Sequence, residues 1–393
     1  MRVLHFCGSF SPLTQTFIYD QIVELERQAG DQYVVTLARK DEIARPFPKV
    51  HFAKPPAWWN AVRIWNRARG RSWGAPLWLS TSAAWQKRLM RAIRAVSPDG
   101  LHAHFGREGI LLSPLACQLG LPLITSFYGY DASQLLEDPT WRALLQRHIT
   151  QAAGTISLSE RMRDRLIAIG APADRAHIVH LGKRLEDYPF LPPKRVRRFL
   201  SVGRMTEKKG HLDTLRAYSY AAGEFPDTHL DIVGEGPLLT AVERFVRTRG
   251  LSGNVTLHGG LPHERVRQML GTADAFLLCS KTAADGDAEG TPTVLLEAQA
   301  AGLPCISTFH AGIPEAVPKA NHQLLVPEGD VEGITDRLRW LIGATPSDLL
   351  RIAELGRAHV HSEYNLLSET RKLRSVYQHV IPYHPPTQAM LHA

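Results

Sequence analysis

The chain has 393 residues, of which 44% are hydrophobic and 21% charged, and its formal net charge is +8. This composition is typical of a soluble globular protein with two domains of ordinary size, and it excludes a low-complexity chain. No apolar stretch approaches the length of a membrane span. The four cysteines are far apart without metal-ligand spacing, and Met1–Cys7 does not resemble a signal peptide. We therefore expect reduced thiols in a cytoplasmic protein.

Strands and helices alternate through the first half of the chain. A first strand is expected at Arg2–Cys7, followed by a loop at Gly8–Pro12 and an amphipathic helix from Thr14 to Gln28. The further strands are expected at Tyr33–Ala38, Gly100–Ala103, Leu123–Ser126, Gly154–Leu158 and Ile178–Leu181. This alternation predicts an α/β domain with a parallel sheet, in which ligands bind at the carboxyl ends of the strands.

Five residues near these strand ends are candidates for binding or chemistry. Gly8 would allow a ligand to approach the backbone closely, although a plain tight turn explains it equally well. Strand alternation places His102 and His104 on one face, and His104 ends its strand. Tyr128 can donate a hydrogen bond to a ligand oxygen, and its neutral phenol is a poor proton carrier at neutral pH. Asp131 either holds this loop or caps a helix.

A basic segment rich in tryptophan interrupts the pattern between Ile43 and Pro98. It contains no Asp or Glu, eleven Lys or Arg residues, and six of the eight tryptophans. One interpretation is a set of helices with a solvated basic face and tryptophan in the core. The other is a surface that docks on anionic membrane, since Trp favours the headgroup region and cations are attracted to it. Nothing else resembles a nucleic-acid module, so we expect no nucleic-acid partner.

The second half repeats strand-then-loop units after a linker at 188–198 that contains three prolines. Its first loop contains Arg204 and Lys209, two cations at a strand-to-helix turn that suit a diphosphate. The next loop contains Glu235 and Gly236. Strands are expected at Phe199–Val202, Leu230–Val233, Val255–His258 and Ala275–Leu278, which predicts a second doubly wound sheet.

The most informative stretch is Glu289–Glu297, where two carboxylates lie eight positions apart. The residues between them predict a turn that enters a helix, with Pro292 in the first turn. The free N–H groups from Thr291 to Val294 would form an anion site at the helix start. One carboxylate can then hold sugar hydroxyls and the other a ribose.

These motifs together resemble the retaining family 4 glycosyltransferases of GT-B fold, in the colanic-acid and exopolysaccharide branch. The resemblance rests on Gly203-Arg204, Lys209-Gly210, Val233–Pro237, Glu289–Glu297 and Ala311–Glu315. It is dense over residues 198–330 and looser over 1–190. It implies two Rossmann-like domains that face a central cleft: an acceptor domain at 1–190, a nucleotide-sugar domain at 191–362, and a helix and tail at 363–393 that cross back to the first domain.

The family implies roles for these residues in sugar transfer from a nucleotide diphosphate sugar with retention. Glu289, Tyr128 and His104 would be the catalytic residues, although relatives often have His where Tyr128 stands, which puts proton transfer there in doubt. The leaving diphosphate would accept the acceptor's proton. The donor-binding residues would be Gly8, Arg204, Lys209, Glu235, Gly236, Thr291, Pro292, Thr293, Val294 and Glu297.

The expected partners are the nucleotide sugar and a lipid-linked or oligosaccharide acceptor in the synthesis of exopolysaccharide or lipopolysaccharide. No cofactor or metal is expected, because Arg and Lys replace the cation at the diphosphate and Asp285-Gly-Asp287 is interpreted as a loop near the sugar. The enzyme would be cytoplasmic and peripheral on the inner leaflet. Two alternatives stay open: a nucleotide-sugar epimerase or other enzyme of this fold, and a non-catalytic nucleotide-sugar-binding subunit.

Overall fold

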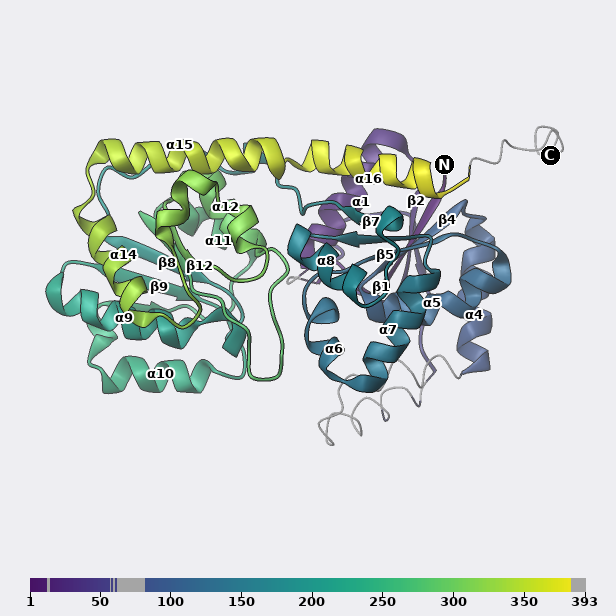
Figure 1. The fold of residues 1–393 in the computed structure, drawn as a ribbon, viewed down its shortest axis with the longest axis horizontal. Helices are drawn as coiled ribbons and strands as arrows, with labels where there is room; N and C mark the ends of the chain where they lie inside the picture. The colour runs from purple at the N-terminus through teal and green to yellow at the C-terminus, as the bar shows by residue number, and fades with distance from the viewer. Residues whose placement is uncertain (13–14, 57, 59–60, 62–81, 383–393) are drawn as a thin grey trace. The chain divides into compact units, whose positions relative to one another are not determined.

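The computed structural model describes residues 1–12, 15–56, 58, 61 and 82–382 (Figure 1). The chain divides into two compact units. The first comprises Met1–Ser157, Arg163–Val179 and, among the described residues, the chain from Thr370 onward. The second comprises Leu158–Met162 and His180–Glu369. No helix within the described residues is long and apolar enough to cross a membrane.

The first unit contains a parallel sheet of seven strands in the order β3-β2-β1-β4-β5-β6-β7. Its strands are β1 (Val3–Phe10), β2 (Gln32–Arg39), β3 (Val50–Phe52), β4 (Gly100–His104), β5 (Leu123–Ser126), β6 (Gly154–Ser157) and β7 (Ala176–Ile178). The order reverses direction at β1 and β4, which is the switch point where doubly wound sheets bind ligands. The predicted parallel sheet is therefore confirmed.

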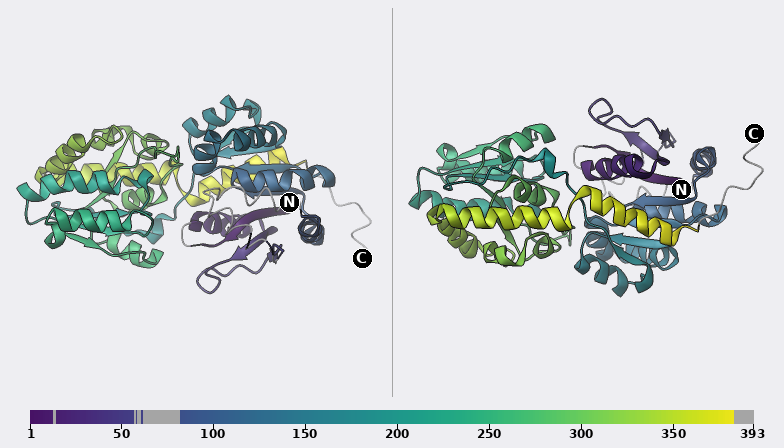
Figure 2. Two further views of the ribbon diagram at one scale, coloured as in Figure 1. Left: turned by 90° about the horizontal axis from the view of Figure 1, so that it is seen from below. Right: turned by 90° about the horizontal axis from the view of Figure 1, so that it is seen from above.

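Helices cover both faces of this sheet, because successive strand residues point to opposite sides (Figure 2). Leu4 and Phe6 of β1 pack in a core with α4 (Ala83–Val96) and α5 (Gly106–Leu119). Val3 of the same strand packs in another core with residues of α1 (Thr16–Ala29) and α16 (Leu366–Val380). The other helices in the described part of this unit are η2 (Tyr130–Ala132), α6 (Gln134–Glu137), α7 (Pro139–Gln151) and η3 (Ala173–Arg175), and α8 (Glu160–Ala168) belongs to it from Arg163 onward.

The second unit contains a parallel sheet of six strands in the order β10-β9-β8-β11-β12-β13. Its strands are β8 (Arg198–Val202), β9 (His229–Val233), β10 (Val255–Leu257), β11 (Ala275–Leu278), β12 (Cys305–Thr308) and β13 (Leu325–Val326). Its α-helices are α9 (His211–Glu224), α10 (Leu239–Thr248), α11 (His263–Leu270), α12 (Thr293–Ala301), α13 (Ile313–Ala316), α14 (Val331–Gly343) and α15 (Pro346–Glu363). Its 3₁₀ helices are η4 (Leu185–Asp187), η5 (Glu207–Lys209), η6 (Leu251–Gly253) and η7 (Lys319–Leu324).

The structure corrects the predicted loop after the first strand. β1 continues to Phe10, because Ser9 and Phe10 still pair with Ala38 and Arg39 of β2. The sequence predicted a strand that begins at Ile178, but the short strand β7 ends at that residue. Both errors concern element ends, which local sequence specifies weakly because pairing with a neighbouring strand decides them.

Candidate functional site

The loops of the second unit that carry the predicted donor-binding residues follow the carboxyl ends of β8, β9 and β11. Gly234 shows why glycine is needed here, because a Cβ at this position would lie 1.8 Å from the Gly203 carbonyl oxygen. The loops after β8 and β9 are further joined by a hydrogen bond from the Met205 N–H to the Glu235 carbonyl, at 2.8 Å. The Glu235 carboxylate accepts a hydrogen bond from the Gly260 N–H, at 3.2 Å. The two neighbouring loops therefore form one connected edge.

Lys209 and Glu289 form an ion pair at this edge of the sheet. The Nζ–Oε1 distance is 2.7 Å, and both side chains are largely shielded from solvent. Burial acts to raise the pKa of Glu289, but the charges of Lys209 and Lys208 outweigh it and hold the pKa at about 2. Glu289 is therefore ionised at neutral pH and lies beside two fixed cations.

His310, in the loop after β12, positions the backbone of Glu289. Its Nε2 accepts a hydrogen bond from the Glu289 N–H at 3.1 Å. Its Nδ1 lies 2.6 Å from Oε1 of Glu328, whose other oxygen accepts the Thr282 N–H at 2.7 Å. Since Nε2 accepts, Nδ1 carries the proton and donates to Glu328. The His310 tautomer is thus fixed, and the imidazole holds the start of the Glu289 segment.

Glu297 lies on α12 and is almost completely buried. Lys183 Nζ lies 2.5 Å from its Oε1, and His263 Nε2 lies 3.3 Å from its Oε2. Burial tends to raise the pKa of Glu297, whereas the Lys183 charge and His263 lower it to about 2. Both oxygens of this carboxylate are therefore engaged by groups of its own unit.

The start of α12 lies between the two carboxylates, as predicted. The helix begins at Thr293 after Pro292, whose extended backbone angles are φ −67° and ψ 109°. Thr293 and Val294 are partly exposed. The first N–H groups of a helix have no partner within the helix, so they are available to an anion. Arg204 is exposed, and the described residues contain no ion-pair partner for it.

The two aspartates of the loop after β11, Asp285 and Asp287, are held by neighbouring groups. Lys208 Nζ lies 2.8 Å from Oδ1 of Asp287, and the Asp287 N–H donates to Oδ1 of Asp285 at 3.1 Å. Asp287 therefore already has a cation as its partner. Whether the enzyme uses a metal stays a prediction.

The predicted residues of the first unit meet at the ends of β4 and β5. His104 is fully buried, and its Nδ1 lies 2.6 Å from the Tyr128 hydroxyl. Asp131 holds this region together, because its carboxylate accepts the N–H groups of Gly106, Tyr128 and Gly129 at 2.9–3.1 Å. Burial raises the pKa of Asp131 to about 6, while these hydrogen bonds act in the opposite direction. Of the two interpretations left open for Asp131, the structure shows the one in which it holds the loop.

Gly8 lies within β1 and faces a carboxylate that the sequence did not single out. A Cβ at Gly8 would lie 2.6 Å from Oε1 of Glu108, in the first turn of α5. Glu108 is buried and pairs with Arg107 at 2.8 Å. The close approach that Gly8 permits is therefore that of a side chain of its own unit.

The basic segment is described only in part. Trp85 of α4 is completely buried and its Nε1 donates to the Ala53 carbonyl at 3.1 Å, whereas Trp58 is 42% exposed. The outer face of α4 carries exposed cations, which are Lys87, Arg88, Arg91 and Arg94. The remaining tryptophans of the segment, Trp59, Trp65, Trp73 and Trp78, lie outside the described residues.

Comparisons with known proteins place this geometry in a family. The profile described as "Glycosyl transferases group 1" matches residues 186–356, and the profile "Glycosyltransferase Family 4" matches residues 14–187. The amylovoran biosynthesis glycosyltransferase AmsK of Erwinia amylovora is 32% identical, with 74% of each chain covered. The chain belongs to the family 4 glycosyltransferases.

Two further proteins are similar over nearly the whole length. WcaL of Escherichia coli (strain K12), assigned as a colanic acid biosynthesis glycosyltransferase, is 27% identical over 96% of this chain and 100% of its own. The crystal structure of Anabaena HepE in complex with UDP and glucose has a TM-score of 0.78 at 15% identity, covering 96% of this chain and 100% of that one. The GT-B fold and the resemblance to the exopolysaccharide branch are confirmed, and these names favour transfer over the epimerase alternative.

Several contacts of the candidate site were not predicted from the sequence. They are made by Lys183, His263, His310, Lys208 and Glu108. Lys208 offered a local signal, since it adjoins Lys209. The other four residues are distant in sequence from their partners and meet them only in the folded chain. Lys183, for example, lies 114 positions from Glu297.

Proposed function

We propose that this glycosyltransferase moves a sugar from a nucleoside diphosphate sugar to a lipid-linked or oligosaccharide acceptor, with retention at the anomeric carbon, in the synthesis of a surface exopolysaccharide. The observation that carries the proposal is the Lys209–Glu289 pair at 2.7 Å, at the sheet edge that also carries the start of α12. The colanic acid and amylovoran names of the relatives support the pathway, and the UDP complex of Anabaena HepE supports the donor class.

On this proposal, Lys209 and Arg204 bind the donor diphosphate together with the N–H groups at the start of α12. A diphosphate that draws Lys209 away from Glu289 leaves this carboxylate free to accept the hydroxyls of the transferred sugar. Glu297 binds the ribose hydroxyls, and Lys183 keeps that carboxylate ionised so that it accepts hydrogen bonds. Gly236 lets the loop after β9 approach the donor closely.

The chemical step then needs little proton transfer from the protein. The leaving diphosphate accepts the proton of the attacking hydroxyl on the same face of the sugar, and the configuration is retained. The fixed cations stabilise the charge that develops on the leaving group, and the site orients the two substrates. This division of work accommodates Tyr128 in a place where many relatives have a histidine.

The donor site is tested by replacing its cations. Arg204→Ala and Lys209→Ala should each weaken UDP or GDP binding about tenfold to a hundredfold, because each removes a charge-assisted hydrogen bond worth roughly 1.5–3 kcal/mol. Titration calorimetry with UDP and GDP measures this, and Arg216→Ala on α9, whose guanidinium pairs with Asp213, is the matched control. Unchanged affinity and turnover in folded Arg204, Lys209, Glu289 and Glu297 variants would refute the assignment.

Retention and metal independence have separate tests. Proton NMR of the first-formed product reports its anomeric configuration directly, and inversion would contradict the retaining mechanism. The enzyme should stay active in EDTA, because Asp287 is paired with Lys208 and because Arg204 and Lys209 neutralise the diphosphate. Loss with EDTA and rescue by Mn²⁺ would instead assign a metal to the enzyme.

We also propose that the basic segment at 43–98 docks on the anionic inner leaflet of the cytoplasmic membrane, where a lipid-linked acceptor would lie. The outer face of α4 supports this, because three arginines and one lysine are exposed there while Trp85 and Leu89 are buried on the inner face. Cations near an anionic surface contribute about 1 kcal/mol each.

A further inference from the structure

Three histidines lie together in the middle of the first sheet, on one face of it. His5 of β1 is in register with His102 of β4, and His104 is in register with Ser126 of β5. All three imidazoles are completely buried, and the His102 and His104 rings stack with centroids 4.4 Å apart. Their ligand atoms lie within 4.8 Å of one another, so a metal and a hydrogen-bond network are rival explanations for the cluster.

Every ring nitrogen of the cluster already has a hydrogen-bond partner. His5 Nε2 lies 3.0 Å from Gln32 Oε1, and His5 Nδ1 lies 3.0 Å from His104 Nε2. His104 Nδ1 lies 2.6 Å from the Tyr128 hydroxyl. On the second branch, His102 Nε2 and Nδ1 lie 2.7 Å from Ser126 Oγ and 2.6 Å from the Tyr377 hydroxyl. Nitrogens satisfied in this way leave no lone pair for a metal unless the network is broken.

The direction of these hydrogen bonds is set at Gln32. Its amide nitrogen donates to the Gly30 carbonyl at 2.9 Å, and a carbonyl can only accept. The amide oxygen of Gln32 therefore faces His5 and must also accept. Consequently His5 Nε2 carries the proton, and in a neutral imidazole the other nitrogen, Nδ1, accepts.

The same reasoning continues through the cluster. Since His5 Nδ1 accepts, His104 Nε2 carries the proton and donates to it. His104 Nδ1 then accepts, so the Tyr128 O–H donates. Burial lowers the pKa of His5 to about 4 and that of His104 well below its ordinary value, in agreement with neutral rings.

We propose that Gln32, at the start of β2, acts as a positioning residue that fixes the tautomers of His5 and His104 and thereby turns the Tyr128 hydroxyl proton inward. This deepens the proposed function, because it defines what Tyr128 offers an acceptor. A phenol whose proton is committed to His104 presents only oxygen lone pairs to a ligand. The complementary group is a donor, such as a sugar hydroxyl, and Tyr128 cannot protonate a substrate. His104 becomes a positioning residue, since both of its nitrogens are occupied.

Gln32 does not set the direction of the second branch. His102 lies between the hydroxyls of Ser126 and Tyr377, at 2.7 and 2.6 Å, and a hydroxyl can donate or accept, so either neutral tautomer of His102 satisfies both contacts. Burial lowers the pKa of His102 well below its ordinary value, in agreement with a neutral ring.

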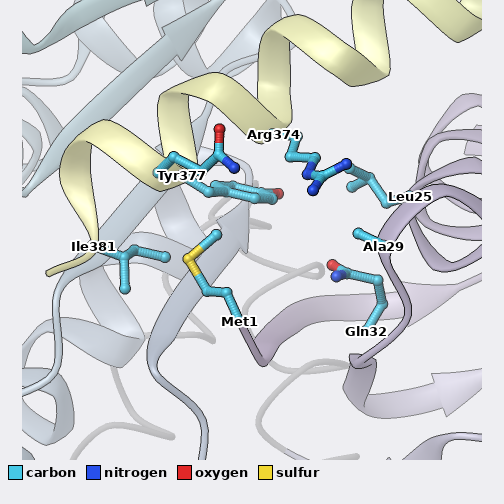
Figure 3. A pocket seen from close by; sticks show the side chains of 8 residues that line it. Met1, Leu25, Ala29, Gln32, Arg374, Tyr377 and Ile381 are labelled. Carbon is cyan, nitrogen blue, oxygen red and sulfur yellow. The ribbon is translucent and has the colours of Figure 1, made fainter. Parts of the chain in front are cut away.

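Gln32 and Tyr377, which begin the two branches, reach one pocket of the first unit. Gln32 and Tyr377 line it together with Leu25, Arg374 and Ile381, and its volume is about 400 Å³ (Figure 3). Both branches therefore begin at this pocket, and the branch from Gln32 leads through His5 and His104 to Tyr128. Because this branch runs through His5 and His104, a substitution at Gln32 should change the hydrogen bonding of the Tyr128 hydroxyl without touching it directly.

The proposal is tested by long-range ¹H–¹⁵N correlation spectra of histidine-labelled full-length protein without substrate, which distinguish the two tautomers. His5 and His104 should each be neutral and protonated at Nε2, and His102 should be neutral, with signals assigned by comparison with single His→Gln variants. An Nδ1–H tautomer or an imidazolium at His5 or His104 at pH 7 would overturn it. So would a stoichiometric metal ion in purified protein that is lost from the His104→Gln variant.

The role of Gln32 has its own comparison. Gln32→Met removes the acceptor that fixes His5, so the His104 signal should leave the pure Nε2–H form. Gln21→Met on α1 removes another buried amide of the same unit outside this network, and should leave the His104 signal unchanged. An unchanged His104 tautomer in Gln32→Met would reject Gln32 as its cause. These spectra contain no sugar, so their outcome is independent of whether the enzyme proves to be a retaining transferase.

Discussion

The histidines buried in the middle of the first sheet are neutral imidazoles, whereas the carboxylates buried at the edge of the second sheet are paired with lysines. His5, His102 and His104 form hydrogen bonds with one another or with uncharged partners. In the second unit, Glu289 and Glu297 each lie within 2.7 Å of a lysine. These two clusters of one GT-B enzyme thus hold polar groups in place by different physical means.

The difference matches what each side would bind under the proposed function. A diphosphate carries charge, so its site needs cations, and those cations need carboxylate partners when the site is empty. An acceptor sugar carries hydroxyls, whose recognition depends on which partner donates and which accepts. A neutral network with one direction supplies that information without a buried charge.

The largest effect is expected from breaking the Lys183–Glu297 pair. Lys183→Met should destabilise the second unit by about 3–5 kcal/mol, because it leaves a buried carboxylate without a partner. Hydrogen exchange of peptides from α12 and β11 measures this locally, since two units need not unfold together. Lys183→Arg, which keeps the charge, is the matched control.

A double variant separates this stability effect from donor binding. Lys183→Met combined with Glu297→Met removes both charges, so it should recover most of the lost stability. It should still bind UDP poorly, because the proposed ribose carboxylate is gone. If the double variant bound UDP like the wild type, Glu297 would be a structural residue only.

The next effect is a difference in acid sensitivity between the two units. In the first unit, burial lowers the pKa of His5 and His148 from 6.5 to about 4, and it lowers that of His102 and His104 well below 6.5. Below pH 6.5 the unfolded chain binds protons that the folded unit does not, so stability falls as the pH drops from 6.5 toward 4. For His5 alone this amounts to roughly 3 kcal/mol.

The second unit should respond mainly at lower pH. Its carboxylates Glu289 and Glu297 have pKa values of about 2 against 4.5 in the unfolded chain, so their contribution is complete above pH 4.5 and is lost as the pH falls from there toward 2. Only His211 in the described part of this unit has a pKa lowered to about 4. Hydrogen exchange at pH 7, 5.5 and 4.5 should show peptides of β1 and β4 opening first. Simultaneous loss of protection in both units would contradict the comparison.

The sequence predicts the parts of this comparison that depend on neighbours along the chain. Alternating strands and helices predict both sheets, and the spacing of Glu289 and Glu297 around Pro292 predicts a helix start between two carboxylates. His102 and His104 are placed on one face by strand alternation alone, and the register of β4 confirms it.

Partners brought together by the fold could not be predicted in the same way. His102 and Tyr377 are 275 positions apart, and His5 and His104 are 99 positions apart. Their pairing depends on which strands are adjacent and on α16 packing against the sheet, neither of which a local pattern specifies. For the same reason, no local pattern marked Lys183 as a partner of Glu297. The predicted end of β1 was wrong because pairing with β2 decides where this strand ends.

The smallest effect per residue is expected at the basic surface of the first unit, which is the outer face of α4. Its cations are exposed to solvent, whereas the charges at the sheet edge of the second unit are buried in pairs. Replacing Arg88, Arg91 and Arg94 of α4 with Gln should weaken binding to phosphatidylglycerol vesicles by about 1 kcal/mol per charge. Cosedimentation measures the loss, and 1 M salt should mimic it, because the Debye length there is about 3 Å. UDP binding should not change.

The matched control for this surface lies in the second unit. Arg244, Arg247 and Arg249 are also exposed cations at or beside one helix, α10. Their replacement by Gln removes the same charge from the whole protein, so it should leave vesicle binding nearly intact if docking is local to the first unit. An equal loss in both triple variants would mean that net charge alone governs the attraction. Binding to neutral phosphatidylcholine vesicles as strong as to anionic ones would reject electrostatic docking altogether, and the exposed arginines of α4 would then be only a solvated helix face.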